Sequence, residues 1–233
     1  MQLFYINNLE SDFQELDKEE SNHCIRVLRM GVGDELHLTD GSGLLCKARI
    51  ASADAKRCSL QIVERCYEYQ KRNHYLHMAV APTKNMARFE WFLEKAVEIG
   101  IDEITPLICK HSERTSINME RLDKVVVAAM KQSLKAYKPI VNSPMRISDF
   151  IKQYFEGEKY VAYCEGNDRK LLKDLYTRGE SALVLIGPEG DFSVEEISTL
   201  MDNNYIPISL GDCRLRTETA ALAACFLVNF INQ

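Results

Sequence analysis

Two short apolar runs near the C-terminal end of the sequence constrain the fold most strongly. The runs cover residues 183–186 (LVLI) and 206–210 (IPISL), and each is followed by a glycine, Gly187 or Gly211, that opens a loop before a helical pattern. This order of strand, loop and helix occurs twice and predicts an open α/β sheet. In such sheets ligands bind at the carboxyl ends of the strands, where loops present backbone N–H and C=O groups. We therefore expect the functional site at these two loops.

The hydrophobic pattern divides the chain into two parts, and 233 residues are enough for two domains of ordinary size. Residues 1–70 alternate apolar and polar positions, with a hairpin expected around Asp40–Gly41. A polar, basic stretch follows, and from Tyr75 apolar strands alternate with helical patterns. We predict a small β-rich domain over residues 1–70 and an α/β domain over residues 74–233. Within the latter we expect helices over 119–137 and 147–155 and a final helix over 217–232.

The charge distribution indicates a possible contact with nucleic acid only locally. The chain carries a net charge of −5, but residues 71–140 alone sum to +4. A basic belt across the middle of the molecule is compatible with binding to a phosphate backbone. For Arg26 and Arg29 in residues 1–70, solvated charges flanking a small barrel are an equally good explanation.

The cysteines and the N-terminal residues indicate where the protein works. Eight cysteines include no C-x-x-C pair and no cluster at metal-ligand spacing, so we expect reduced, packed thiols and no metal. The N-terminal residues lack a basic region followed by a long apolar stretch, and no apolar run approaches the length of a membrane span. We expect a cytoplasmic protein without a membrane partner.

The two loops contain the residues best suited to chemistry. The first, beginning with Gly187, contains neither a dinucleotide fingerprint nor a P-loop, and on spacing alone it is a tight turn with a carboxylate, Glu189. The second brings Arg214, Arg216 and Glu218 to the start of a helix, where cations oppose the helix dipole. A functional role for a guanidinium would explain this placement, as would a salt bridge to Glu189 or Glu218.

The same two segments carry a resemblance to a known family. LIGPEGDFS (185–193) and SLGDCRLRTETAALAA (209–224) resemble the paired signatures of the RsmE family, the 16S ribosomal RNA uridine-N3 methyltransferases of the SPOUT superfamily. KNMARFEWFLEKAVEIG (84–100) is similar to that family's helical segment, and His23, residues 27–29 and residues 33–34 are similar to its PUA-like domain. Asp191 departs from the pattern where a second glycine is usual, and Lys135 departs from it where an arginine is more typical.

The resemblance implies the architecture and the cofactor. The expected fold is a SPOUT-type α/β domain with a deep trefoil knot, preceded by a PUA-like β-barrel that binds RNA. It also implies a homodimer and S-adenosylmethionine as the methyl donor. The residues that would hold the cofactor are Ile186, Gly187, Gly190, Ser209, Leu210, Gly211 and Leu215.

The implied reaction sets the expected catalytic roles. N3 of uridine is a poor nucleophile while it keeps its proton, so the enzyme must remove that proton or stabilise the anion. Arg216 is a permanent cation and is expected to stabilise the developing charge, with Glu218 or Glu189 as candidates to accept the proton. Because N3 takes part in base pairing, the uridine must be unpaired or extruded. The expected RNA contacts are Arg26, Arg29, Lys84, Arg88, Arg114 and Lys135.

Two other functions remain open at this point. A non-catalytic RNA-binding or ribosome-assembly protein on the same fold would need the basic belt but not Gly187, Gly190, Gly211 and Arg216 together. The presence of all four favours catalysis. A nucleotide- or phosphate-binding α/β enzyme is the second alternative, and comparing the binding of S-adenosylmethionine, ATP and NAD would distinguish it.

Overall fold

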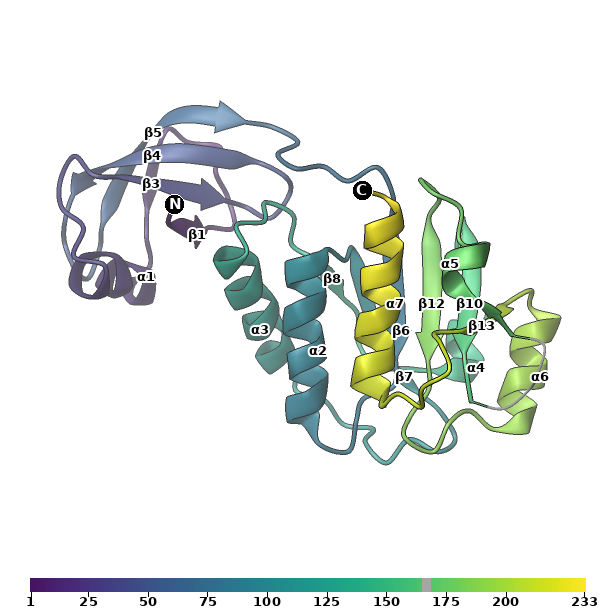
Figure 1. The fold of residues 1–233 in the computed structure, drawn as a ribbon. Coiled ribbons are helices and arrows are strands. Elements are labelled where there is room, and N and C mark those ends of the chain that lie inside the picture. Colours follow the sequence, from purple (N-terminus) through teal and green to yellow (C-terminus); the bar gives the residue numbers. More distant parts are fainter. Residues whose placement is uncertain (165–168) are drawn as a thin grey trace. The chain divides into compact units, whose positions relative to one another are not determined.

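The structure, a computed structural model, describes residues 1–164 and 169–233 and divides into two compact units (Figure 1). The first unit consists of Met1–Lys71 and Val127–Lys138, and the second of Arg72–Val126 and Pro139–Gln233. The expected domain limits of 1–70 and 74–233 stay a prediction. By packing, residues 127–138 group with the N-terminal part of the chain.

The first unit is built on a five-stranded sheet with strand order β1-β3-β4-β5-β2. β1 and β3 are parallel and the other pairs are antiparallel, and the hairpin expected around Asp40–Gly41 is confirmed as β3 and β4. A short helix, α1, begins after the N-cap Asp17 and continues into a π-helical turn, η1. The elements are β1 (Leu3–Tyr5), β2 (Phe13–Glu15), α1 (Lys18–Asn22), η1 (His23–Val27), β3 (Glu35–Thr39), β4 (Leu45–Ser52) and β5 (Ser59–Cys66).

A later part of the chain completes this unit. Ala136 is buried with Leu3 and Leu45, and its carbonyl accepts hydrogen bonds from Thr39 Oγ1 at 3.2 Å and from the backbone N–H of Gly43 at 2.9 Å. These contacts join residues that lie nearly a hundred positions apart. The first unit therefore includes residues 127–138, which begin with the last part of the helix Met119–Gln132.

The helix expected over 119–137 is shorter in the structure. Helix α3 (Met119–Gln132) ends five residues earlier, because Leu134 adopts a left-handed conformation with φ of 58°. A leucine rarely adopts this conformation. The backbone N–H of Lys135 turns back to the carbonyl of Met130 at 3.0 Å, and the chain after it gives its backbone groups to the first unit.

The second unit is built on an entirely parallel sheet with strand order β11-β13-β10-β12-β6-β7-β8, in which β9 also pairs with β7. Its strands are β6 (Leu76–Val80), β7 (Glu103–Ile108), β8 (Ile140–Val141), β9 (Met145–Arg146), β10 (Glu158–Ala162), β11 (Lys170–Leu171), β12 (Ala182–Ile186) and β13 (Ile206–Ser209). Its further helices are α2 (Met86–Ile99), α4 (Ile147–Phe150), α5 (Leu172–Leu175), α6 (Val194–Asp202) and α7 (Thr217–Ile231). The expected helix over 147–155 is confined to α4, and hydrogen-bonded turns follow it.

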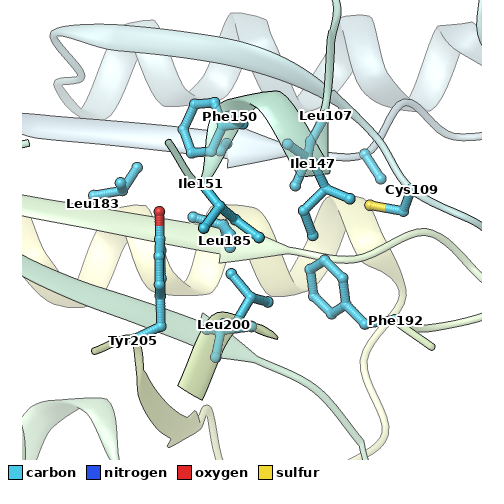
Figure 2. Close-up of a cluster of buried hydrophobic side chains, with 13 residues drawn as sticks. Leu107, Cys109, Ile147, Phe150, Ile151, Leu183, Leu185, Phe192, Leu200 and Tyr205 are labelled. Atoms are coloured by element: carbon cyan, nitrogen blue, oxygen red, sulfur yellow. The ribbon is translucent and has the colours of Figure 1, made fainter. Parts of the chain in front are cut away.

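Helices cover the central strands of this sheet. α7 packs on β6 and β12 and against α2, and the small side chains of Ala221 and Ala224 on α7 are fully buried there. Alternate strand residues point to opposite faces, and Leu183 and Leu185 join the cluster formed with α4 and α6 in Figure 2. β12, in the middle of the sheet, is apolar and buried along its whole length, as is typical of a parallel strand covered on both faces.

Among the described residues, no helix combines the length and the apolar character needed to cross a lipid bilayer.

Candidate active site

The strand order brings several loops to one edge of the parallel sheet. β13, β10, β12, β6 and β7 are neighbours and run in the same direction, so the loops that follow them begin side by side. Each loop is named here after the strand it follows. They are the β6 loop (81–85), the β7 loop (109–118), the β10 loop (described at 163, 164 and 169), the β12 loop (187–193) and the β13 loop (210–216).

The β12 loop turns sharply just after its strand. The backbone N–H of Asp191 donates to the carbonyl of Pro188 at 2.9 Å and closes the turn. A Cβ atom on Gly190 would stand 3.1 Å from Cβ of His111, so the absence of a side chain lets the β7 loop approach. Asp191 itself has a left-handed backbone with φ of 60°.

Two neighbouring loops hold the β12 loop from one side. The Lys84 backbone N–H in the β6 loop donates to Oε1 of Glu189 at 2.9 Å. His111 in the β7 loop places Nδ1 3.0 Å from the carbonyl oxygen of Gly190 and 3.1 Å from that of Asp191. Both partners are acceptors, so Nδ1 must carry the proton.

The end of the β12 loop is fixed by the core and by a helix cap. Phe192 is buried in the cluster of Figure 2 beside residues of α4 and α6. Ser193 and Glu196 form a reciprocal capping box at the start of α6. Oε1 of Glu196 also accepts the backbone N–H of Lys110 at 2.7 Å, which ties the β7 loop to the same helix.

One buried hydrogen bond joins the β13 loop to the β12 loop. Thr217, the first residue of α7, donates from Oγ1 to the carbonyl oxygen of Gly187 at 3.1 Å. Gly211 supplies the left-handed turn of the β13 loop with φ of 121°, and Oγ of Ser209 accepts its backbone N–H at 3.2 Å. The two segments singled out in the sequence therefore meet, although thirty residues separate Gly187 from Thr217.

The charged residues of the β13 loop and of the start of α7 have unusual surroundings. Arg216 is the N-cap residue of α7 and is exposed, and within the described part of the chain its guanidinium has no hydrogen bond or ion pair. Glu218 is 7% exposed, and its Oε2 is buried without a hydrogen-bond partner among the described residues. Its Oε1 lies 3.8 Å from Nε of Arg88. Arg216 is therefore not held at the start of α7 by a salt bridge to Glu218 or Glu189.

The candidate RNA contacts fall into two groups. Lys84, Arg88 and Arg114 are exposed in the second unit, and Nη2 of Arg114 donates to the backbone carbonyl of Lys84 at 3.2 Å. Arg26 and Arg29 are exposed in the first unit, which also contains the partly buried Lys135.

The residues expected to hold a cofactor line the β12 and β13 loops. Two of them, Leu210 and Leu215, are partly buried apolar side chains on the β13 loop. Gly211 has open space where a side chain would stand, and the apolar side chains of this loop suit a ligand that has an adenine and a polar chain. The members of the set are Ile186, Gly187, Gly190, Ser209, Leu210, Gly211 and Leu215.

Other chemistry at this edge receives less support. Burial raises the pKa of the Cys109 thiol, so it is not a ready nucleophile. Among residues 1–164 and 169–233, no three His, Cys, Asp or Glu side chains gather where they could hold a metal ion.

Sequence reasoning did not assign the residues that hold the loops together. Thr217 was visible only as part of a motif and Asp191 only as a departure from one, and His111 was not singled out. Hydroxyl, carboxylate and imidazole groups at the ends of neighbouring strands were the available signal, but their partners depend on the strand order.

The chain matches known families over most of its length. Residues 70–229 match the RNA methyltransferase domain family, and residues 16–63 match the RNA methyltransferase PUA domain family. A relative from Rickettsia conorii, the ribosomal RNA small subunit methyltransferase E, is 31% identical over 98% of this chain and 95% of its own.

Solved structures show the same fold. A probable rRNA-methyltransferase from Porphyromonas gingivalis has a TM-score of 0.93 and 40% identity, covering 100% of this chain and 98% of its own. A putative methyltransferase from Legionella pneumophila, solved with the bound cofactor S-adenosylmethionine, has a TM-score of 0.85 and 28% identity. That match covers 96% of this chain and 94% of the other.

We predict that Thr217→Val weakens the fold by leaving the buried Gly187 carbonyl without its donor. The expected loss in the free energy of unfolding is about 1–3 kcal/mol, measured by urea denaturation. Thr219→Val is the matched control, because Thr219 is exposed on the same turn of α7. Equal stabilities of the two variants would show that the hydrogen bond does not hold the loops together.

Proposed function

Because this chain belongs to the RNA methyltransferase family, with a ribosomal RNA small subunit methyltransferase E among its relatives, we propose that it methylates N3 of a uridine in the 16S ribosomal RNA of the small subunit. S-adenosylmethionine is the methyl donor, as the Legionella pneumophila neighbour with that bound cofactor supports. We further propose that the enzyme works in the cytoplasm, together with its ribosomal RNA substrate.

The observation that carries this proposal is the union of the β12 and β13 loops through Thr217 and Gly187. Through this hydrogen bond, the glycines and apolar side chains of the two loops lie close to the guanidinium of Arg216 and the buried carboxylate of Glu218. A non-catalytic assembly factor would have no use for this combination, whereas a methyltransferase needs both parts.

The cofactor-binding set fits S-adenosylmethionine. Backbone groups of Ile186, Gly187, Gly190, Ser209 and Gly211 would hold its polar parts, and Leu210 and Leu215 would enclose its adenine. When bound, the cofactor supplies an electrophilic methyl group on a sulfonium. Oε2 of Glu218 is buried and accepts no hydrogen bond from any of the described residues.

Arg216 stabilises the negative charge that develops on the uridine. Its guanidinium is exposed at the start of α7 and has no partner among the described residues, so it is available to the carbonyl oxygens beside N3. A permanent cation fixed where charge develops lowers the barrier without having to move a proton.

Glu218 is the better of the two candidates for the proton on N3. Oε1 of Glu189 already accepts the backbone N–H of Lys84, so that carboxylate has a structural task in holding the β12 loop. Glu218 is buried and keeps one oxygen without a partner in the described residues. In the proposed step the N3 proton moves to this oxygen, the N3–methyl bond forms and the methyl–sulfur bond breaks.

RNA contacts are proposed on each unit separately. Lys84, Arg88 and Arg114 are exposed in the second unit, and Arg26, Arg29 and the partly buried Lys135 belong to the first unit. The target uridine must leave any base pair before its N3 edge can enter the site.

The proposal extends to topology and assembly. We propose that the C-terminal half of the second unit is a trefoil knot, for which family membership and the close contact of the β12 and β13 loops are the support. We also propose a homodimer. Phe226 and Phe230 on α7 are 51% and 60% exposed and stack with ring centroids 5.7 Å apart, which leaves a large apolar surface for a second copy.

Methyl transfer to isolated ribosomal subunits tests the function directly. Small subunits from a strain lacking this protein should receive labelled methyl groups from S-adenosylmethionine, and digestion followed by mass spectrometry should identify 3-methyluridine. If the protein binds the subunits but transfers no label, the assembly-factor alternative replaces the enzyme.

We predict that Arg216→Ala lowers kcat by about 10²–10³-fold, because one charge-stabilising group is removed from the transition state. The affinity for S-adenosylmethionine should change by no more than about twofold, since the group acts on the uridine. Single-turnover kinetics and calorimetry measure the two effects. Arg178→Ala is the control, because Arg178 precedes β12 and lies at the opposite edge of the sheet. A wild-type rate for Arg216→Ala would remove Arg216 from the mechanism.

We predict that Phe230→Asp converts a wild-type dimer into a monomer, because a carboxylate would have to be buried in the interface. Sedimentation equilibrium measures the mass of each species. Val194→Asp is the matched control, since Val194 is 77% exposed on α6. A monomeric wild-type protein, or a dimeric Phe230→Asp variant, would contradict the proposed interface.

A further inference from the structure

We propose that Asp191 is a positioning residue for the cofactor site, because its carboxylate clamps the β10 loop against the β12 loop. One oxygen, Oδ1, accepts the backbone N–H of Phe192 at 2.8 Å, and the other, Oδ2, accepts the backbone N–H of Cys164 at 2.7 Å. This inference rests on the proposed function for the identity of the ligand, but not for the contact itself.

The clamp matters because of the place of β10 in the sheet. β10 pairs with β12 on one side and with β13 on the other, so the β10 loop emerges between the two loops of the proposed cofactor site. Thr217 joins the β12 and β13 loops directly, and Asp191 adds the loop that lies between them.

The backbone of Asp191 is also held by hydrogen bonds, which makes the clamp stiff. The Asp191 carbonyl accepts His111 Nδ1, and its backbone N–H closes the turn to Pro188. With backbone and side chain both engaged, one residue connects the β7, β10 and β12 loops. A site held open in its binding geometry loses less entropy when the ligand enters.

The backbone conformation of Asp191 allows a clean test of its side chain. Its φ of 60° lies in the left-handed region, which glycine adopts freely and aspartate adopts more readily than most residues. Asp191→Gly therefore suits the backbone and removes both hydrogen bonds of the carboxylate. A fall in affinity in this variant cannot be attributed to a strained turn.

Cys164 reports on the clamp independently of the cofactor. Burial, and then the neighbouring Asp191 carboxylate, raise the pKa of the exposed Cys164 thiol. Removing the charge in Asp191→Asn should lower that pKa and increase the fraction of reactive thiolate at a fixed pH. Asparagine has only one acceptor oxygen, so it can satisfy the backbone N–H of Phe192 or of Cys164 but not both.

The test compares wild type, Asp191→Gly, Asp191→Asn and a control, Asn204→Gly. Asn204 is an exposed residue after α6 with φ of 62°, so replacing it by glycine relieves the same kind of backbone without touching the site. S-adenosylmethionine affinity is measured by calorimetry, and kcat and KM are measured with ribosomal subunits. Alkylation of Cys164 by iodoacetamide is followed by peptide mass spectrometry, with the exposed Cys213 of the same molecule as reference.

We expect Asp191→Gly to weaken S-adenosylmethionine binding about tenfold and to raise the KM for the cofactor equally. The kcat at saturating cofactor should stay within about twofold of wild type, and Asn204→Gly should match wild type throughout. In Asp191→Asn, Cys164 should react faster relative to Cys213. Wild-type affinity in Asp191→Gly, or an unchanged ratio of alkylation rates in Asp191→Asn, would overturn the inference. A wild-type protein that does not bind S-adenosylmethionine would instead refute the proposed function.

Discussion

The parallel pairing of β12, β10 and β13 is the constraint on which the site depends. Each of these strands has a parallel partner on both sides, so the loops that follow them all begin at the same edge of the sheet. The loops then need few further contacts to become a rigid surface. Thr217 supplies one of these contacts and Asp191 another, and both bind backbone groups, which do not change with the neighbouring side chains.

The two candidate carboxylates illustrate how the same residue type takes different roles in one site. Glu189 is exposed and accepts a hydrogen bond from a backbone N–H of the β6 loop, so its role is to hold the β6 and β12 loops together. Glu218 is buried and keeps an oxygen without a partner in the described residues, which costs free energy unless a ligand or the substrate uses it. The surroundings of each group, rather than its distance from Arg216 along the chain, separate the two roles.

Much of this arrangement could be predicted from the sequence. The apolar runs at 183–186 and 206–210 and the final helix expected over 217–232 each depend on residues close together in the chain, and the structure has β12, β13 and α7 there. The strand order and the contact of Lys84 with Glu189 depend on residues far apart, which no local pattern encodes. The early end of α3 was missed for the same reason, since the left-handed Leu134 is held by packing that its neighbours in sequence do not reveal.

The return of residues 127–138 to the first unit has a consequence for how the chain is made. An N-terminal domain usually can fold as soon as it has left the ribosome. Here the Ala136 backbone and side chain are needed beside Thr39 and Leu45, so the first unit stays incomplete while much of the second is still being synthesised. Until Ala136 has been synthesised, the nascent sheet has all five of its strands but lacks the residue that packs on Leu3 and Leu45.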